Sequence, residues 1–275
     1  MGKIELRGRT VVVTGATRGL GKQIALYLAV HEGANLVLVG RNRSGLEEVA
    51  GQIAARCSVA VRIIVQDLLE NGSARKIFKG VQELDVFGLV NNAGSTYYGH
   101  TEASRIDIFR SIIELDLQIV VELSLLFLSR FKEAGEGFIF NITSLASFVP
   151  VPYQAVYAAA KSAAQSFSES LAEENRGSRI VVSTFAPAGI VTDIITESGL
   201  TLHMQKHRYV YLTPERAAEM AVRALKRGRR LIIPGLVNRF IYSLINLLPR
   251  PMLIAASGRV FRYEKYRIPD RDRRS

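Results

Sequence analysis

Short apolar runs alternate with helix-forming segments along most of this 275-residue chain. Residues 10–15, TVVVTG, form a β-branched run that ends in a turn, which is typical of a strand buried on both faces. Residues 19–34 then place apolar side chains at helical spacing, and similar pairs continue to LIIPG at residues 231–235. This alternation predicts an α/β fold, a doubly wound parallel sheet of about seven strands with helices on both faces. In such sheets, ligands bind at the carboxyl ends of the strands.

Composition narrows the class of protein. The chain has one cysteine, Cys57, so an internal disulfide is excluded and nothing indicates an oxidising compartment. The first residues lack the apolar run of a signal peptide, and no stretch reaches the roughly 18 apolar residues of a membrane-spanning helix. We therefore expect a cytoplasmic protein, with peripheral contact at a membrane surface left open.

The net charge of +11 is placed unevenly. From Lys226 to the end there are 13 Lys or Arg and three Asp or Glu, a net of +10, so the first 225 residues carry about +1. A uniformly basic domain would suggest nucleic acid, whereas here a nearly neutral domain carries a basic end. We therefore do not expect nucleic acid as the partner.

The turn after the first strand, TGATRGLG at residues 14–21, is rich in glycine where a helix begins. Glycines there allow a tight turn and let the backbone approach a pyrophosphate at the helix N-terminus. The alternative is a turn without a ligand, but the position between strand and helix favours a dinucleotide. The residues expected to contact it are Gly15, Thr17, Arg18, Gly19, Leu20 and Gly21.

The end of the second strand, LVLVGRN, bears on which dinucleotide is bound. A carboxylate there would bind the ribose hydroxyls of NAD, but this chain has Gly40 and Arg41. Arg18 lies in the glycine turn, and two guanidinium groups suit a 2′-phosphate. The sequence thus predicts NADP(H) over NAD(H). The alternative is that Arg41 only begins a solvated helix.

Polar or small residues also follow the third and fourth strands. Asp67 is placed to accept a hydrogen bond from the adenine amino group, and NNAG lets the chain pass close to a cofactor. The contacts expected here are Asp67, Leu68, Asn91, Ala93 and Gly94.

The segment YAAAK places Tyr157 and Lys161 one helical turn apart on the same face. Alone, such a pair is common on protein surfaces. A cation beside a phenol can, however, lower the phenol's pKa from about 10 and stabilise the phenolate.

Over residues 8–235 the chain resembles the classical short-chain dehydrogenase/reductase (SDR) family. The resemblance is carried by an ordered set of motifs: TGATRGLG, Asp67, NNAG, NITS, YAAAK and the segment 187–192. The resemblance implies an oxidoreductase acting on CH–OH or C=O groups, for which Arg18 and Arg41 predict NADP(H) as the cofactor. It implies a Rossmann-type catalytic domain at residues 1–235 and no metal site. It further implies that Lys161 and Tyr157 contact the cofactor, and that the nicotinamide is contacted by Pro187, Gly189, Ile190 and Thr192.

Reduction of a carbonyl needs a hydride on carbon and a proton on oxygen. The Lys161 ammonium and the positive nicotinamide of the oxidised cofactor are together expected to stabilise the Tyr157 phenolate. Tyr157 is then expected to act as general acid in reduction and as general base in oxidation. Ser144 lies 13 residues before Tyr157, the spacing that the family implies, and is expected to hold the substrate carbonyl. Thr143 and Ser147 fit that spacing less well.

Asp116 is a departure from the family, which usually has an asparagine in this helix to support a water leading protons to the lysine. A carboxylate only accepts hydrogen bonds, whereas an amide also donates them. Three alternatives remain open: Asp116 holds the water, pairs with Lys161 and weakens its effect on Tyr157, or is misaligned by one residue.

The substrate is expected to contact loops above the strand ends. Segment 197–212 combines apolar and basic residues, which suggests a lid for an apolar substrate with an anionic end or, alternatively, a solvated loop. The favoured reaction is reduction of a ketone or aldehyde, lipid-like or 3-oxoacyl. The alternatives are an alcohol or hydroxysteroid-type dehydrogenase running oxidatively, or a catalytically weakened dinucleotide-binding or membrane-associated protein. The substrate residues expected are Tyr97, Tyr98, Ser144, Leu200 and Met204.

Residues 236–275 form a basic amphipathic extension, predicted to be helical but not an independent domain. Apolar residues from Val237 to Ile245 fall on one helical face, and Pro249 and Pro251 end the helix. Such helices can lie on an anionic membrane. The favoured alternative is packing over the cleft or on another subunit. The family resemblance implies a homodimer or homotetramer.

Overall fold

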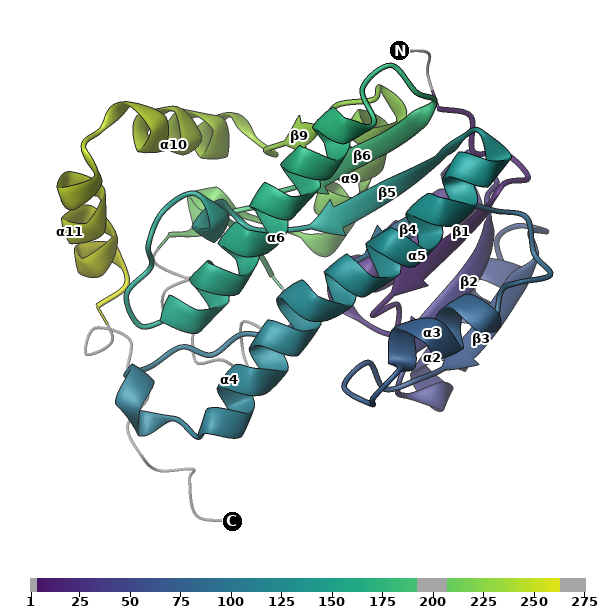
Figure 1. The fold of residues 1–275 in the computed structure, drawn as a ribbon, viewed down its shortest axis with the longest axis horizontal. Coiled ribbons are helices and arrows are strands. Elements are labelled where there is room, and N and C mark those ends of the chain that lie inside the picture. The colour runs from purple at the N-terminus through teal and green to yellow at the C-terminus, as the bar shows by residue number, and fades with distance from the viewer. Residues whose placement is uncertain (1–3, 192–206, 263–275) are drawn as a thin grey trace.

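Seven parallel strands form the centre of the computed structural model, which describes residues 4–191 and 207–262 (Figure 1). Their order in the sheet is β3-β2-β1-β4-β5-β6-β9. The strands are β1 (Thr10–Thr14), β2 (Asn35–Gly40), β3 (Val61–Val65), β4 (Val86–Asn91), β5 (Gly137–Ile142), β6 (Ile180–Phe185) and β9 (Leu231–Ile232). The predicted doubly wound sheet is therefore confirmed, and the strand order reverses between β1 and β4, where ligands bind in such folds.

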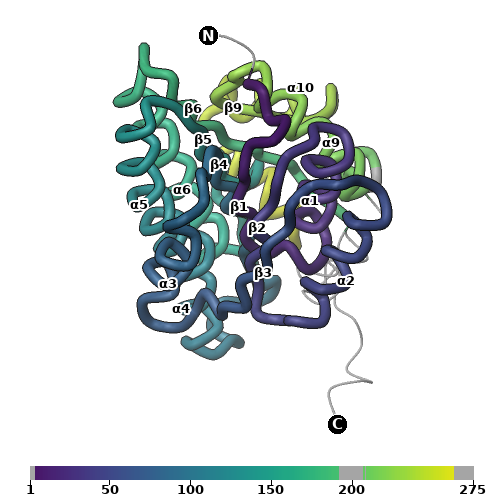
Figure 2. Tube along the Cα trace, turned by 90° about the vertical axis from the view of Figure 1, so that its right-hand side faces the viewer, coloured from purple at the N-terminus to yellow at the C-terminus, as the bar shows by residue number. Residues whose placement is uncertain are grey.

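Helices cover both faces of the sheet (Figure 2). One layer contains α1 (Gly19–Glu32), α2 (Arg43–Ala54) and α9 (Pro214–Lys226), and the other contains α3 (Ser73–Lys79), α4 (Ile106–Ile113), α5 (Ile119–Ala134) and α6 (Ala155–Glu174). Successive residues of a strand point to opposite faces. Val11 and Val13 therefore pack in the core under α1, whereas Val12 packs in the core under α5.

Short elements shape the loops at the carboxyl edge of the sheet. They are the 3-10 turns Thr101–Ala103, Leu145–Ser147 and Arg208–Val210, the π-helical turn Glu114–Gln118, and the strand pair β7 (Gly189–Ile190) and β8 (Tyr211–Leu212). Within residues 4–191 and 207–262, no helix is both long enough and apolar enough to cross a bilayer.

The C-terminal extension forms two helices, α10 (Leu236–Leu247) and α11 (Arg250–Val260), as predicted (Figure 1). The break between them falls at Pro249, which precedes α11. Asn238 Nδ2 donates to the carbonyl oxygen of Val210 at 3.2 Å, and Ser257 Oγ donates to that of Pro150 at 2.7 Å. Of the predicted alternatives, the helices therefore pack on the body of the chain.

Gly88 of β4 offers a test of how tightly the sheet is packed. A Cβ there would overlap the ring of Phe138, its partner on β5. We expect Gly88→Ala to reduce the free energy of unfolding by about 1–3 kcal/mol through overpacking. A Cβ on Gly51 of α2 would meet no atom within 4 Å, so Gly51 serves as the control.

Gly51→Ala should raise the free energy of unfolding by about 0.5–1 kcal/mol, because alanine is the better helix former. Urea unfolding followed by circular dichroism measures both. Equal effects of the two substitutions would contradict the packing of Gly88 against Phe138.

Candidate active site

A cavity of about 870 Å³ lies along the carboxyl edge of the sheet. Gly15 and Arg41 line one end, and Ser144 and Tyr157 line the middle. The far wall comes from the C-terminal helices, including Ile245 of α10. The cleft is therefore built from the strand ends and closed by the extension.

The glycine turn brings the backbone close to neighbouring strands. Gly15 has a φ of 65°, and a Cβ there would lie 2.9 Å from Ala93 Cα. A Cβ on Gly21 would overlap the carbonyl oxygen of Gly15, so this glycine serves helix–strand packing. Arg18 and Arg41 are exposed at the rim of this end of the cleft. Two cations beside a bare backbone turn suit an anionic ligand.

Most residues predicted to bind a cofactor meet along this cleft. Those that line it are Gly15, Thr17, Arg18, Gly19, Leu20, Arg41, Asp67, Leu68, Ala93, Gly94, Tyr157, Lys161, Pro187, Gly189 and Ile190. Gly21 and Asn91 are not among the described lining residues. Asn91 lies beneath the site, where its Nδ2 donates to Asn141 Oδ1 at 2.9 Å. Thr192, Leu200 and Met204 lie outside the described residues.

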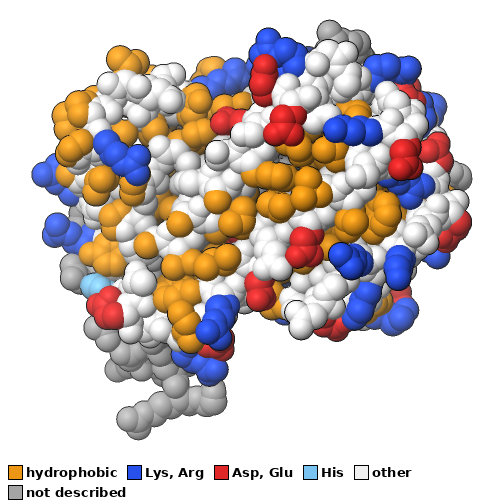
Figure 3. Space-filling view, in the orientation of Figure 1, with side chains coloured by type: hydrophobic (Ala, Val, Ile, Leu, Met, Phe, Trp, Pro, Cys, Tyr) orange, Lys and Arg blue, Asp and Glu red, His pale blue; other side chains and the backbone are white. Residues whose placement is uncertain are grey.

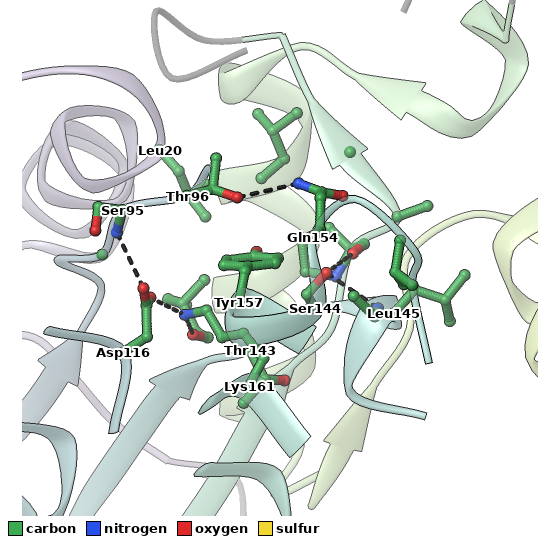
Figure 4. A pocket seen from close by; sticks show the side chains of 18 of the residues that line it. Leu20, Ser95, Thr96, Asp116, Thr143, Ser144, Leu145, Gln154, Tyr157 and Lys161 are labelled. Atoms are coloured by element: carbon green, nitrogen blue, oxygen red, sulfur yellow. Dashed lines mark hydrogen bonds and ion pairs between the residues drawn. The ribbon is translucent and has the colours of Figure 1, made fainter. Parts of the chain in front are cut away.

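Asp116 and Lys161 form a buried ion pair at the centre of the site (Figure 4). Asp116 is fully buried in the π-helical turn, and its Oδ1 lies 2.8 Å from Lys161 Nζ. The Ser95 N–H donates to Asp116 Oδ2 at 3.1 Å, and Lys161 Nζ also donates to the Ile142 carbonyl oxygen at 2.8 Å. A Cβ on Gly94 would overlap Asp116 Oδ1, so glycine is needed beside the pair. The alternative in which Asp116 pairs with Lys161 is the one observed.

The ion pair changes the pKa values of both of its members. Burial alone would lower the pKa of Lys161, but Asp116 and then Tyr157 raise it above its ordinary value. Burial raises the pKa of Asp116, and the Lys161 ammonium and the Ser95 N–H oppose that rise. The ammonium therefore stays charged, with its nearest countercharge on Asp116.

Tyr157 lies between this pair and Ser144 (Figure 4). Lys161 Nζ is 5.9 Å from the centre of the Tyr157 ring. Burial raises the pKa of Tyr157, Lys161 lowers it, and Asp116 raises it again, so the pKa lies above its ordinary value. The sequence predicted the opposite direction. That prediction combined the ammonium with the positive nicotinamide of an oxidised cofactor, and it stays a prediction for the cofactor-bound site. Among the protein groups alone, burial and the Asp116 carboxylate outweigh the ammonium.

Ser144 is the hydroxyl of the NITS segment that is best placed in the cleft. Its Oγ accepts from the Ala146 N–H at 3.1 Å and lies 3.5 Å from the Pro187 carbonyl oxygen. Thr143 instead donates to Gln165 Oε1 at 2.8 Å, and Ser147 lies behind, 3.4 Å from the Ser144 N–H. The geometry agrees with the preference for Ser144 over its neighbours.

Comparison with known families accords with this geometry. A family model described as short chain dehydrogenase matches residues 9–202. This chain is a short-chain dehydrogenase. It belongs to that family of oxidoreductases, and solved members share the fold that the sequence predicted.

Two curated relatives are about one-third identical to this short-chain dehydrogenase over roughly two-thirds of its length. Human very-long-chain 3-oxoacyl-CoA reductase is 31% identical over 191 residues, 68% of this chain, and mouse dehydrogenase/reductase SDR family member 7B is 33% identical over 199 residues, 70% of this chain. In both cases the match covers 61% of the relative's own length.

Solved structures share the fold. A short-chain dehydrogenase from Sphingobium yanoikuyae, in complex with NADPH, is 25% identical with a TM-score of 0.79, covering 96% of this chain and 99% of that one. One from Burkholderia phymatum, in complex with NAD, is 22% identical with a TM-score of 0.78, covering 88% and 94%. One of these neighbours thus binds NADPH and the other binds NAD. At 22% identity, the structure from Burkholderia phymatum supports the fold alone.

Tyr97 and Tyr98 differ from the sequence prediction, since neither is among the described residues that line the cleft. Tyr97 OH donates to the His100 carbonyl oxygen at 3.2 Å, and its ring packs on Phe109. Tyr98 is buried, and its OH donates to the Phe261 carbonyl oxygen at 3.0 Å. It therefore helps to hold the end of α11 in place.

Gln154 is a cleft residue of this short-chain dehydrogenase that sequence reasoning missed. It precedes α6 and lies three residues before Tyr157, so one helical turn places both at the cleft. Its Nε2 donates to Thr96 Oγ1 at 3.0 Å (Figure 4). A polar amide at that spacing from the tyrosine was the available signal.

Proposed function

We propose that this short-chain dehydrogenase reduces the carbonyl of an apolar substrate with NADPH. The observation that carries the proposal is the arrangement of Ser144, Tyr157 and Lys161 in one cleft that ends at Arg18 and Arg41. One end of the cleft thus suits a phosphorylated ribose, and the middle suits proton transfer to a carbonyl oxygen.

The residues of the cleft fit a dinucleotide. Gly15 has no side chain that would collide with Ala93, so the glycine turn packs closely at the strand ends and lines the cleft. Asp67, whose Oδ1 accepts from the Leu69 N–H at 3.0 Å, lines the cleft where the adenine end would be held. Arg18 and Arg41 would bind a 2′-phosphate, which favours NADP(H) over NAD(H). When bound, NADPH supplies the hydride.

The chain's own groups handle the proton. A raised pKa keeps the Tyr157 phenol protonated near neutral pH, which is the form that a general acid needs for reduction. Ser144 Oγ would hold the substrate carbonyl, since Ser144 lines the cleft beside Tyr157 and its side chain hydrogen-bonds with that phenol. Lys161, paired with Asp116, supplies part of the positive field that would stabilise the Tyr157 phenolate left after the proton passes to the carbonyl oxygen.

The far wall of the cleft favours an apolar substrate. Its lining includes Val149, Val151, Leu248, Leu253 and Val260. A relative named very-long-chain 3-oxoacyl-CoA reductase agrees with a lipid-like or 3-oxoacyl substrate. Reduction is favoured over oxidation because a preference for NADP(H) leans toward reduction, and the net direction is set by the ratio of reduced to oxidised cofactor in the cell.

A catalytically weakened dinucleotide-binding protein is the second candidate. The observation that favours it is the Asp116–Lys161 pair, since Asp116 offsets the effect of Lys161 on Tyr157. The two candidates differ in whether Tyr157 supports turnover.

A homodimer or homotetramer built on α5 and α6 is part of the proposal. Figure 3 shows hydrophobic side chains gathered over these two helices, and Leu125 of α5 is exposed. Light scattering should give two or four times the mass of the chain, and Leu125→Glu should reduce it. A monomeric wild-type protein would contradict this assembly.

Cofactor preference is tested by fluorescence titration with NADPH and NADH. Wild-type protein should bind NADPH more tightly, and Arg41→Ala should weaken NADPH binding by about tenfold to a hundredfold while changing NADH binding little, because only NADPH carries the 2′-phosphate. Arg43→Ala is the matched control, since Arg43 is exposed two residues away and lies near Glu47.

Equal binding of the two cofactors, or an equal loss in both variants, would contradict the proposed role of Arg41. Binding of neither cofactor would reject the proposed function as a whole.

The role of Asp116 is tested by the pH dependence of turnover. Its carboxylate raises the pKa of Tyr157, so Asp116→Asn should lower that pKa. Oxidation uses the phenolate, so kcat/KM for an alcohol should reach its plateau at a lower pH in the variant than in the wild type. Reduction uses the protonated phenol, so its kcat/KM falls as the pH rises, and in the variant this fall should begin at a lower pH. Tyr157→Phe, which should lose turnover but keep NADPH binding, is the inactive control. Superimposable profiles of wild type and Asp116→Asn would show that Asp116 does not tune Tyr157.

A further inference from the structure

The outer face of the C-terminal helices is apolar. On α10, Leu236, Phe240 and Leu247 are 82%, 64% and 80% exposed, and their spacing places them within about 40° around the helix axis. Met252 and Ile254 of α11 are also exposed. Met252 and Ile254 are about 200° apart around α11 and so lie on its two flanks. The outer face consists of the three α10 residues with these two flanking residues of α11.

The same helices are apolar on the side toward the cleft. Ile241 and Ile245 of α10, with Leu253 and Val260 of α11, line the cavity. Packing on the body of the chain therefore accounts for the inner residues but leaves Leu236, Phe240 and Leu247 facing solvent. Several large apolar side chains gathered on an exposed surface indicate a binding surface.

The charges around the outer face are of one sign. Residues 231–263 contain four arginines, and no Asp or Glu occurs in this part of the sequence. Arg239 and Arg250 are exposed, and Figure 3 shows basic side chains beside hydrophobic ones over α10 and α11, at the upper left. A second copy of this face would bring like charges together, whereas an anionic surface would complement them.

We propose that the outer face of α10 and α11 binds the surface of an anionic membrane. The helices contain 12 and 11 residues, well short of the roughly 20 that span a bilayer, so they lie along the interface. The apolar side chains enter the headgroup boundary, and Arg239 and Arg250 attract anionic lipid headgroups.

This orientation places the cleft wall directly beneath the lipid. One layer of helix separates the outer face from the cavity, since Phe240 is exposed while Ile241, about 100° further around the same helix, lines the cavity. An apolar substrate dissolved in the bilayer would reach the cleft without crossing water. This consequence rests on the proposed function, whereas membrane binding itself does not.

Vesicle co-sedimentation of the full-length protein tests the proposal. The probes are vesicles of phosphatidylcholine alone and of phosphatidylcholine mixed with phosphatidylserine, at low and high salt. Wild-type protein should pellet with the anionic vesicles and be released by salt. The double substitution Phe240→Asp, Leu247→Asp should reduce the partition coefficient by about tenfold or more, because two apolar contacts are replaced by anions.

Ile106→Asp is the matched control, because Ile106 lies on α4 and is 64% exposed, as Phe240 is. It should bind vesicles like the wild type. Arg250→Glu should weaken binding to anionic vesicles more than Arg43→Glu does. Thermal unfolding by circular dichroism checks that each variant is folded, and NADPH binding should be unchanged in all of them.

Wild-type binding to anionic vesicles that survives Phe240→Asp, Leu247→Asp would overturn the proposal. So would a wild-type oligomer that this double substitution dissociates without any vesicle binding, since the outer face would then be an interface between copies of the chain. Because sedimentation needs no substrate, an absence of vesicle binding would leave the proposed carbonyl reduction untouched. Failure of the proposed function would instead appear in the NADPH titration.

Discussion

The ion pair between Asp116 and Lys161 connects the parts that form the site. Asp116 comes from the π-helical turn, Lys161 from α6, and their hydrogen bonds reach Ser95 after β4 and Ile142 on β5. Removing one partner would leave the other buried without a countercharge, which usually costs several kcal/mol. Both elements are therefore fixed to the end of the sheet by the same contact that sets the field at Tyr157.

The pair also explains why the tyrosine behaves differently from the simple expectation. A lone ammonium beside a phenol would favour the phenolate, but this ammonium is held by a carboxylate 2.8 Å away. From Tyr157, the two charges partly cancel, and burial then decides the direction of its pKa. The acid role proposed for Tyr157 would thus depend on Asp116 and Lys161 as well as on the phenol itself.

Local signals explain how much the sequence could predict. Runs such as residues 10–15 define strands by their own composition, and the glycine turn, NNAG and YAAAK keep a fixed relation to strand ends. The sheet and most of the cofactor-binding surface were therefore predictable. The two C-terminal helices were predictable from spacing and the prolines.

The partners of several site residues depend on tertiary packing and could not be predicted from the sequence. Nothing local indicates that Tyr98 points to the carbonyl of Phe261, or that Asn91 turns toward Asn141 beneath the site. The partner of Asp116 was left among three alternatives because a sequence does not give distances between α6 and the π-helical turn. Gln154 was missed because its partner, Thr96, lies 58 residues away in the chain.

The two faces of α10 have a consequence for how this part of the chain can change over evolution. Each residue added to or removed from a helix rotates everything beyond it by about 100°. A single-residue insertion after Asn238 would therefore carry Phe240 and Leu247 away from solvent and exchange them with cleft-lining neighbours. Point substitutions can adjust either face separately, but changes in helix length would alter substrate fit and surface character at once. The length of this helix should consequently drift less than that of the loops around it.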